Sequence, residues 1–306
     1  MPDIQTQLRH QLTAAVQRHT ADAILLSGGL DTSILAYIAK PPVAFTVSFK
    51  DAEAHDVEYA KRVANLLSLE HTERHFDELE ALETLPRVVS ILKTFDPALP
   101  NDLTIYFGLA CARERDVRSV MTGDGADELF AGYSYMSELG PEALDRHLHE
   151  LPQRWQFSSR ALGKALRIEV KQPFLDPEFV NFALTIGPQL KVKQGTGKYV
   201  LRQAFEGLIP GHILWRDKEP IEVGSGSSRL RRAMQRMVSD EEFHVAEKET
   251  GIRFMDKEHY AYYRIYKDVV GDVPKARPRE AGCPCCGAAI GTRHCQVCGF
   301  SLPLNA

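Results

Sequence analysis

A short segment rich in glycine and hydroxyl groups follows an apolar run near the start of the chain. The run Ala-Ile-Leu-Leu ends at residue 26, and a helical pattern begins a few residues later. The segment between them carries Ser27, Gly28, Gly29, Asp31, Thr32 and Ser33. Glycines let backbone N–H groups approach an anion closely, and the N-terminus of a helix attracts phosphate. The segment therefore predicts a phosphate-binding loop.

Asp31 is the unusual residue of this loop, because a carboxylate repels phosphate. Its presence is explained if it holds Mg²⁺ against the phosphates. No lysine stands at the start of the helix, so the loop differs from the GxxxxGK[ST] type. The alternative is a tight turn between strand and helix, with Asp31 as a helix cap.

A second glycine turn, with the sequence TGDGADELFAGY, lies at residues 122–133. It contains Gly123, Asp124 and Asp127 and also follows an apolar run. If the two runs are neighbouring strands, Asp127 faces Asp31, and the two carboxylates can bracket Mg²⁺. The alternative is that Asp127 and Glu128 only begin a helix, where acidic groups suit the helix dipole.

The elements that must position these turns alternate between strand and helix. Strand patterns occupy 22–26, 43–49, 70–76 and the start of 118–133, and helical patterns occupy 5–19, 55–69, 78–94 and 102–115. This order predicts an α/β fold, a parallel sheet with helices on both faces. Such sheets bind ligands at the carboxyl ends of their strands, where both turns lie. From about 150 to 268 we expect a mostly helical region without convincing strands.

The two turns resemble those of a known enzyme family. The first resembles the pyrophosphate loop of the N-type ATP pyrophosphatases (PP-loop enzymes), and the second is similar to the asparagine synthetase motif SGEGADELFGGY. Three further segments, at 169–184, 195–205 and 209–220, resemble landmarks of the same family in the same order. The resemblance spans roughly residues 5 to 230. It implies the adenine nucleotide alpha hydrolase-like fold, with ATP and Mg²⁺ as cofactors.

The resemblance also implies roles for individual residues. It assigns Asp31 and Asp127 to Mg²⁺, and the glycine loop together with Gly123 to the nucleotide. Lys218, in WRDKEP, matches a lysine that stabilises charge during attack on the adenylate, although a lone lysine is usually a solvated surface charge. Lys198, in GKYVLR, is expected to contact phosphate. Arg202 in the same segment is equally explained by a structural ion pair.

Two features depart from the family pattern. Glutamine-dependent asparagine synthetases begin with a glutaminase domain, whereas this sequence begins Met-Pro-Asp and reaches the glycine loop by residue 27. We therefore expect the glutaminase domain to be absent and the nitrogen to come as free ammonia, from a partner glutaminase or from another amine. Asp124 stands where the family has Glu, and its carboxylate lies about 1.5 Å further back. Because attack geometry is demanding, this change puts aspartate as the substrate in doubt.

Five of the six cysteines crowd into residues 283–298. Two CxxC-Gly knuckles supply four sulfurs for tetrahedral Zn²⁺, from Cys283, Cys286, Cys295 and Cys298. Cys285 is spare, and His294 is an alternative ligand. We expect a pyrophosphatase domain at 1–270, with its sheet part at about 1–150 and its helical part at about 151–270. A linker at 271–282 and a zinc ribbon at 283–301 follow.

The composition excludes several functional classes. Lysine and arginine number 37 against 41 acidic residues, so no global positive charge attracts nucleic acid. The sequence contains no run of about 18 apolar residues, so no membrane span is predicted. The N-terminus lacks the pattern of a secretory signal. We expect a cytoplasmic protein.

These features predict an ATP-dependent, AMP-forming amide ligase that adenylates a small-molecule carboxylate and transfers an amine or ammonia. A PP-loop enzyme that modifies tRNA or a carrier protein by sulfur or amide transfer is the first alternative, with the ribbon serving recognition. Basic residues beside the ribbon are one feature that tRNA contact would use. A role in keeping the segment soluble or in docking a protein is the favoured explanation for them. The second alternative is a non-catalytic, ATP-binding scaffold subunit.

Overall fold

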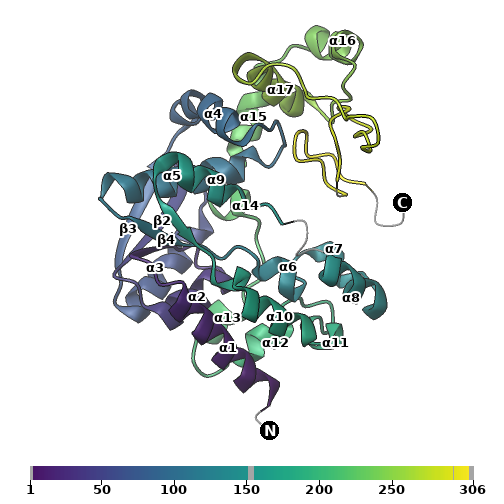
Figure 1. Cartoon of the computed structure of the whole chain (residues 1–306). Coiled ribbons are helices and arrows are strands. Elements are labelled where there is room, and N and C mark those ends of the chain that lie inside the picture. The colour runs from purple at the N-terminus through teal and green to yellow at the C-terminus, as the bar shows by residue number, and fades with distance from the viewer. Residues whose placement is uncertain (1–2, 151–154, 292, 303–306) are drawn as a thin grey trace.

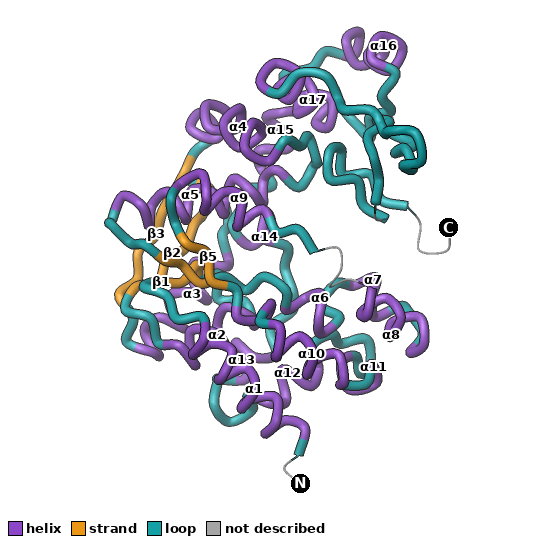
Figure 2. The backbone as a smooth tube through the Cα atoms, in the orientation of Figure 1, coloured by secondary structure: helices purple, strands orange, loops and turns teal. Residues whose placement is uncertain are grey.

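Five parallel strands form one sheet in the order β3-β2-β1-β4-β5 (Figures 1 and 2). The computed structural model describes residues 3–150, 155–291 and 293–302. The strands are β1 (Ala23–Leu25), β2 (Val43–Phe49), β3 (Glu70–Phe76), β4 (Ser119–Met121) and β5 (Glu169–Lys171). The chain adds β2 on one side of β1 and later β4 on the other. The order reverses between β1 and β4, and open α/β sheets bind ligands at such a reversal.

Helices cover both faces of the sheet and extend beyond it (Figure 1). Their bounds are α1 (Ile4–Arg18), α2 (Leu30–Ala39), α3 (His55–Leu67), α4 (Glu78–Leu92), α5 (Leu99–Glu114), α6 (Ala126–Phe130), α7 (Ser134–Ser137), α8 (Pro141–Glu150), α9 (Ser158–Leu166), α10 (Pro177–Thr185), α11 (Pro188–Lys191), α12 (Tyr199–Ala204), α13 (Gly211–Leu214), α14 (Ile221–Gly224), α15 (Arg229–Arg236), α16 (Asp240–Thr250) and α17 (Lys257–Val269). Among the described residues, no helix is long and apolar enough to cross a membrane.

Two apolar cores lie on opposite faces of the sheet. Ala44 packs in the core shared with α1, α2 and α3, whereas its neighbour Phe45 packs in the core shared with α4, α5 and α9. This alternation follows from strand geometry, which points successive side chains to opposite faces. The prediction of a parallel sheet covered on both faces is confirmed.

One sequence prediction fails within the helical region. Convincing strands were not expected after residue 150, yet β5 pairs with β4 in parallel, with Val170 opposite Val120. β5 is a three-residue edge strand, Glu-Val-Lys, with a single apolar side chain. It is too short to show an alternating pattern, because such a pattern needs at least four residues. The predicted division between sheet and helical parts at 150–151 adjoins residues 151–154, which lie outside the described residues.

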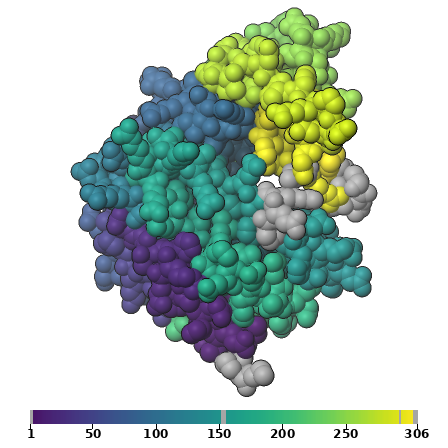
Figure 3. All heavy atoms as spheres, in the orientation of Figure 1, coloured from purple at the N-terminus to yellow at the C-terminus, as the bar shows by residue number. Residues whose placement is uncertain are grey.

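The segment that carries the cysteines packs closely on the rest of the molecule (Figure 3). The backbone N–H of Phe95, between α4 and α5, donates to the carbonyl of Val297 at 2.8 Å. In the region predicted as a linker, Val273 is buried, and the N–H of Ala276 donates to the carbonyl of Gly287 at 3.0 Å. Residues 271–282 therefore contact both the helical part and the ribbon.

Candidate active site

The glycine loop after β1 is held compact by its own hydroxyl groups. The Ser27 Oγ accepts the N–H of Gly29 at 3.2 Å and lies 3.1 Å from the Thr32 Oγ1. Gly28 has φ +68°, and a Cβ there would lie 2.4 Å from the backbone nitrogen of Ala60. Only glycine fits this position, because both the dihedral and the space exclude a side chain. The loop leads into α2, and Asp31 lies in its first turn.

The second turn, after β4, approaches the first so closely that a side chain at Gly123 would press against Asp31. A Cβ on Gly123 would lie 3.2 Å from the Cβ of Asp31. Further along, a Cβ on Gly132 would collide with the Asp127 carboxylate and with the Cε of Lys198. The turn thus places Asp127 beside Asp31. This follows from the strand order, because the two turns follow the neighbouring parallel strands β1 and β4.

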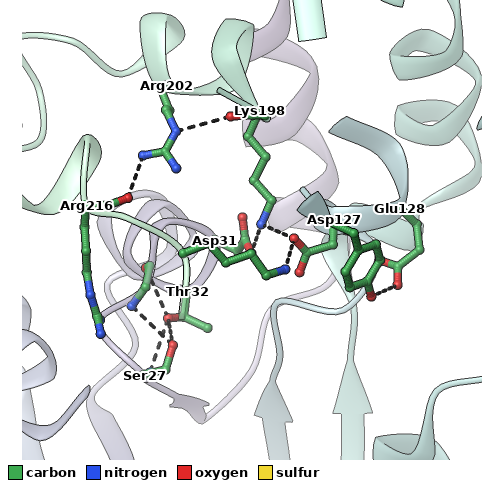
Figure 4. Close-up of polar contacts among 12 residues, drawn as sticks. Ser27, Asp31, Thr32, Asp127, Glu128, Lys198, Arg202 and Arg216 are labelled. Carbon is green, nitrogen blue, oxygen red and sulfur yellow. Dashed lines mark hydrogen bonds and ion pairs between the residues drawn. The ribbon is translucent and has the colours of Figure 1, made fainter. Parts of the chain in front are cut away.

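Two lysines and two aspartates meet in one ion cluster. The Lys198 Nζ lies 2.6 Å from the Asp31 Oδ2 and 2.8 Å from the Asp127 Oδ1 (Figure 4). Lys218 forms a further ion pair with the Asp127 Oδ1. The four side chains come from α2, α6, the start of α12 and the segment after α13. The structure therefore brings together residues that are up to 187 positions apart in the sequence (218 minus 31).

Burial and charge compete in setting the pKa values of this cluster. Burial raises the pKa of Asp31. Burial also acts to raise the pKa of Asp127, but the Lys198 and Lys218 ammonium groups outweigh it and lower this pKa to about 2. Burial acts to lower the pKa of Lys198, and the Asp127 and Asp31 carboxylates raise it above its ordinary value. Lys198 and Asp127 are therefore both charged near neutral pH, which fits a site for charged ligands.

The segment that carries Lys218 is anchored by two arginines. Arg202 donates to the carbonyls of Leu214 and Arg216. The guanidinium therefore binds backbone carbonyls, whereas the sequence analysis had offered a structural ion pair as one explanation for it. Arg216 in turn pairs with Asp56 at 2.9 Å. Burial raises the pKa of Asp56 to about 6, although Arg216 acts to lower it.

Aromatic groups complete the surroundings of Lys218. Its Nζ lies 4.4 Å from the centre of the Tyr133 ring, and the Tyr133 hydroxyl donates to the Glu128 Oε1 at 2.6 Å. The Arg216 guanidinium lies 4.1 Å from the centre of the Tyr59 ring. Cations over aromatic faces are stabilised by the ring quadrupole.

Sequence reasoning missed the anchoring group of Asp56, Tyr59 and Arg216. Asp56 and Tyr59 fall in an ordinary helical pattern, and an acidic residue in a first turn is common. Tyr133 and Glu128 belong to the recognised motif, but nothing in their spacing indicated that the Tyr133 ring lies against Lys218.

Asp124 is turned toward the N-terminus of α9 and is not part of the ion cluster. Its Oδ2 accepts from the Thr122 Oγ1 at 2.7 Å, the Ser159 Oγ at 2.6 Å and the Gln172 Nε2 at 2.8 Å. Among the remaining loop residues, Ser33 is buried, and its Oγ has no partner within the described part of the chain. The sequence predicted nucleotide contact for Ser33 and a role at the substrate for Asp124, and both stay predictions.

Four buried cysteines form a cluster suited to zinc. The Sγ atoms of Cys283, Cys286, Cys295 and Cys298 all lie within 4.8 Å of one another. The pairs Cys283–Cys298 and Cys286–Cys295 are each separated by 3.7 Å. Tetrahedral zinc with bonds of about 2.3 Å would place its sulfurs about 3.8 Å apart, so the donor set fits.

The spare cysteine, Cys285, and the alternative ligand, His294, are engaged elsewhere. The Cys285 Sγ donates to the carbonyl of Arg253 at 2.8 Å. The His294 Nε2 lies 2.8 Å from the Asp96 Oδ2, and its Nδ1 lies 3.0 Å from the Ser301 Oγ. Both side chains therefore fasten the ribbon to its surroundings.

Sequence comparisons find known relatives of this chain. The family model for asparagine synthase matches residues 7–167 and 161–264. The chain is 31% identical over 283 residues to a probable glutamine-hydrolysing asparagine synthetase of Dictyostelium discoideum, covering 79% of this chain and 50% of the relative. It is 29% identical over 301 residues to asparagine synthetase B of Escherichia coli (strain K12), covering 86% of this chain and 53% of the relative. The chain thus spans about half the length of these curated relatives.

Among solved structures, an NMN synthetase from Francisella tularensis matches 89% of this chain and 96% of its own, at 15% identity. Its TM-score is 0.37, which is too low to support an inference about this chain.

Proposed function

Because the chain belongs to the asparagine synthase family, we propose that it is an ATP-dependent carbon–nitrogen ligase that forms AMP and pyrophosphate. The observation that carries the proposal is the ion cluster of Asp31, Asp127, Lys198 and Lys218 at the point where the strand order reverses. A cluster with two cations and two carboxylates suits a nucleotide that carries both phosphate and a divalent metal.

Asp31 and Asp127 are the residues that would hold Mg²⁺. The Asp31 Oδ1 is buried and has no hydrogen-bond partner within the described residues, so it is free to act as a ligand. When bound, the ion offsets the negative charge of the leaving pyrophosphate. The backbone of Gly28 and Gly29 would lie against the phosphates, and the N–H groups in the first turn of α2 would donate to them.

In the proposed first step, a substrate carboxylate oxygen bonds to the α phosphorus and the bond to pyrophosphate breaks. In the second, an amine nitrogen bonds to the acyl carbon, the bond to AMP breaks and the amine releases a proton to solvent. Lys218 would stabilise the negative charge that develops at the adenylate. Arg202 and Arg216 hold the segment on which Lys218 lies, so they act through its position.

We propose a small-molecule carboxylate as the acceptor, with free ammonia, a partner glutaminase or another amine as the nitrogen source. The alternative of sulfur transfer to tRNA has weaker support. It needs a reactive cysteine in the crevice, but Cys111 is a buried residue of α5, and burial raises the pKa of its thiol. Lys275, one of the basic residues beside the ribbon, donates to the Cys286 carbonyl at 3.2 Å and so has a structural use.

For the ribbon we propose bound Zn²⁺ with a structural role. All four thiolates would be used in a closed tetrahedral site, which leaves no position for a substrate. The site lies apart from the ion cluster, so the proposed ligase chemistry does not pass through it.

The test is ATP turnover by the full chain with Mg²⁺, aspartate and ammonium, separating AMP from ADP and assaying for asparagine. The expected result is AMP and pyrophosphate in equal amounts, dependent on a carboxylate. A panel of other small carboxylates, tested in the same way, identifies the acceptor if aspartate is inactive. ADP with inorganic phosphate as the products would contradict the proposal.

A further inference from the structure

Lys218 lies on a segment without regular secondary structure, so its position depends on the contacts that hold its side chain. The segment joins α13 to α14, and residues 216–220 form neither helix nor strand. A lysine side chain is flexible and loses much rotamer freedom when it is fixed in one place. Its ammonium group can act at one reacting atom only if contacts restrict it.

Within the described part of the chain, Lys218 has one ionic contact and one aromatic contact. The ion pair joins its Nζ to the Asp127 Oδ1, an oxygen that the Lys198 Nζ also contacts at 2.8 Å. The Lys218 side chain is 35% exposed, so solvent screens this pair. The aromatic contact is with Tyr133, whose ring centre lies 4.4 Å from the Lys218 Nζ.

The proposed function makes Asp127 a poor anchor for Lys218. Asp127 is also the proposed Mg²⁺ ligand, and a carboxylate oxygen that binds the ion is less available to a lysine. Lys198 has a second carboxylate, because its Nζ also lies 2.6 Å from the Asp31 Oδ2. Among the ion pairs of the described residues, Lys218 has no second carboxylate. The contact of Lys218 for which a metal does not compete is therefore the Tyr133 ring.

The Tyr133 ring is itself held in place. Its hydroxyl donates to the Glu128 Oε1 at 2.6 Å. Burial raises the pKa of Tyr133 well above its ordinary value, and the Glu128 carboxylate adds to this effect. The hydroxyl therefore stays protonated and remains a donor at neutral pH. The ring also packs against a small apolar cluster formed by Ala131, Met136, Leu144 and Leu148.

We propose that Tyr133 is the positioning residue for Lys218, and that its ring, fixed by Glu128, keeps the ammonium group in place when Asp127 binds the metal. The inference rests on the proposed function, in which Lys218 stabilises charge at the adenylate. An aromatic face attracts a cation but carries no net charge, so the charge of Lys218 stays available to the reacting atoms. Tyr133 therefore acts through Lys218.

The first measurement detects the contact without turnover. The full chain, labelled with ¹³C at the lysine ε carbons, is studied by NMR, and Lys218→Arg identifies the Lys218 resonance. The ring current predicts an upfield proton shift for Lys218 that is retained in Tyr133→Phe and lost in Tyr133→Leu. The shift is expected to persist after MgCl₂ is added. Its loss on addition of MgCl₂ would overturn the inference.

The second measurement separates positioning from substrate binding, in single-turnover and steady-state assays of ATP consumption. Tyr133→Leu is expected to lower kcat about tenfold with little change in the KM for ATP, because Lys218 acts after the substrates are bound. Tyr133→Phe keeps the ring and is expected to stay within about threefold of wild type. In the Lys218→Met background, Tyr133→Leu is expected to cause no further loss, because the two residues act through one contact.

Tyr260→Leu is the matched control. Tyr260, on α17, is partly buried as Tyr133 is, but its ring contacts the rings of Phe254 and Tyr263. The change removes a similar aromatic side chain away from Lys218, so kcat is expected to remain at the wild-type value.

Equal effects of Tyr133→Leu and Tyr260→Leu on kcat would overturn the inference, as would a Tyr133→Leu effect that adds in full to that of Lys218→Met. The assays follow ATP consumption, and the products are identified separately. ADP as the product would reject the ligase reaction, whereas the NMR shift and the double-variant comparison would still decide whether Tyr133 positions Lys218.

Discussion

At the scale of single residues, Lys198 and Lys218 are expected to contribute differently to the stability of the fold, although both pair with Asp127. Lys198 is 5% exposed and bridges two carboxylates, whereas the Lys218 side chain is 35% exposed and pairs with one. A buried charge that loses its partner is far more costly than an exposed one. We therefore expect loss of Lys198 to lower the stability of the fold, and loss of Lys218 to lower activity with little effect on stability.

Replacing Lys198 by methionine is expected to destabilise the protein by about 3–5 kcal/mol, because Asp31 and Asp127 would remain buried and close together. Lys218→Met is expected to leave stability nearly unchanged and to reduce AMP formation strongly. Urea unfolding and single-turnover AMP formation measure the two effects. Equal loss of stability in both variants would contradict the bridging role of Lys198.

Asp31→Asn is expected to abolish AMP formation while the protein stays folded. The amide keeps the shape of the side chain but loses the charge that would hold Mg²⁺. Circular dichroism checks the fold, and the Mg²⁺ dependence of ATP binding checks the cause. Turnover at the wild-type rate would reject the metal assignment.

The Asp56–Arg216 pair predicts opposite effects of pH on activity and stability. Below about pH 6 the Asp56 carboxylate becomes protonated, its attraction for Arg216 weakens, and the segment of Lys218 is held less firmly. AMP formation should therefore fall as the pH decreases through about 6. Because the folded-state pKa lies above the ordinary value of 3.8, this group adds stability as the pH falls from about 6 toward 4.

Asp56→Asn provides the check on this prediction. The difference between wild type and variant in the free energy of unfolding should change with pH only across that window, and the acid limb of activity should be absent in the variant. Asp51→Asn, an exposed aspartate in the preceding turn, is the control. A pH dependence that is unchanged in Asp56→Asn would assign the limb to another group.

At the scale of elements, the site depends on how closely the β1–α2 loop approaches its neighbours. Gly28 and Gly195 both have positive φ, but a Cβ on Gly28 would meet the backbone of Ala60, whereas Gly195 faces open space. Gly195→Ala is therefore expected to cost about 1–2 kcal/mol from its dihedral alone. Gly28→Ala adds the collision, so it should cost clearly more and also displace Asp31. Thermal unfolding and AMP formation compare the pair, and equal costs would contradict the close approach.

The elements that could be predicted from the sequence are those with strong local patterns. β2 and β3 were predicted at their observed bounds, because each spans seven residues in the sheet. β5 was missed because it is short and lies at an edge, where pairing with β4 rather than its own composition decides its conformation.

In the candidate site, the residues of the two glycine turns were predicted, but the contacts between distant segments were not. Asp31 and Asp127 were expected to face each other, since both follow parallel strands, and the structure brings them together through Lys198. The anchoring of Arg216 by Asp56 and the burial of Gln172 arise from tertiary contacts between distant segments. No local pattern encodes such contacts, which is why sequence reasoning missed them.

At the scale of the whole molecule, the cysteine ribbon shares one apolar core with α4, α5 and α17. Removing the proposed Zn²⁺ with a strong chelator is therefore expected to lower the melting temperature of the whole protein rather than release a separate module. Cys295→Ser, which removes one of the four sulfurs, should have the same effect and lose sensitivity to the chelator. Calorimetry with zinc quantification measures both, and an unchanged melting temperature after metal loss would contradict this prediction.

The hydrogen bond between Thr94 and the Val297 carbonyl has a consequence for the folding of the protein during its synthesis. The two residues are 203 positions apart, so the junction of α4 and α5 lacks its partner until nearly the whole described chain has been synthesised. Nascent chains fold largely from the N-terminus as they emerge. The sheet can assemble early, but the junction of α4 and α5 must wait for the ribbon. Translation that stops before residue 297 therefore leaves the Thr94 hydroxyl and the Phe95 N–H without their shared carbonyl partner.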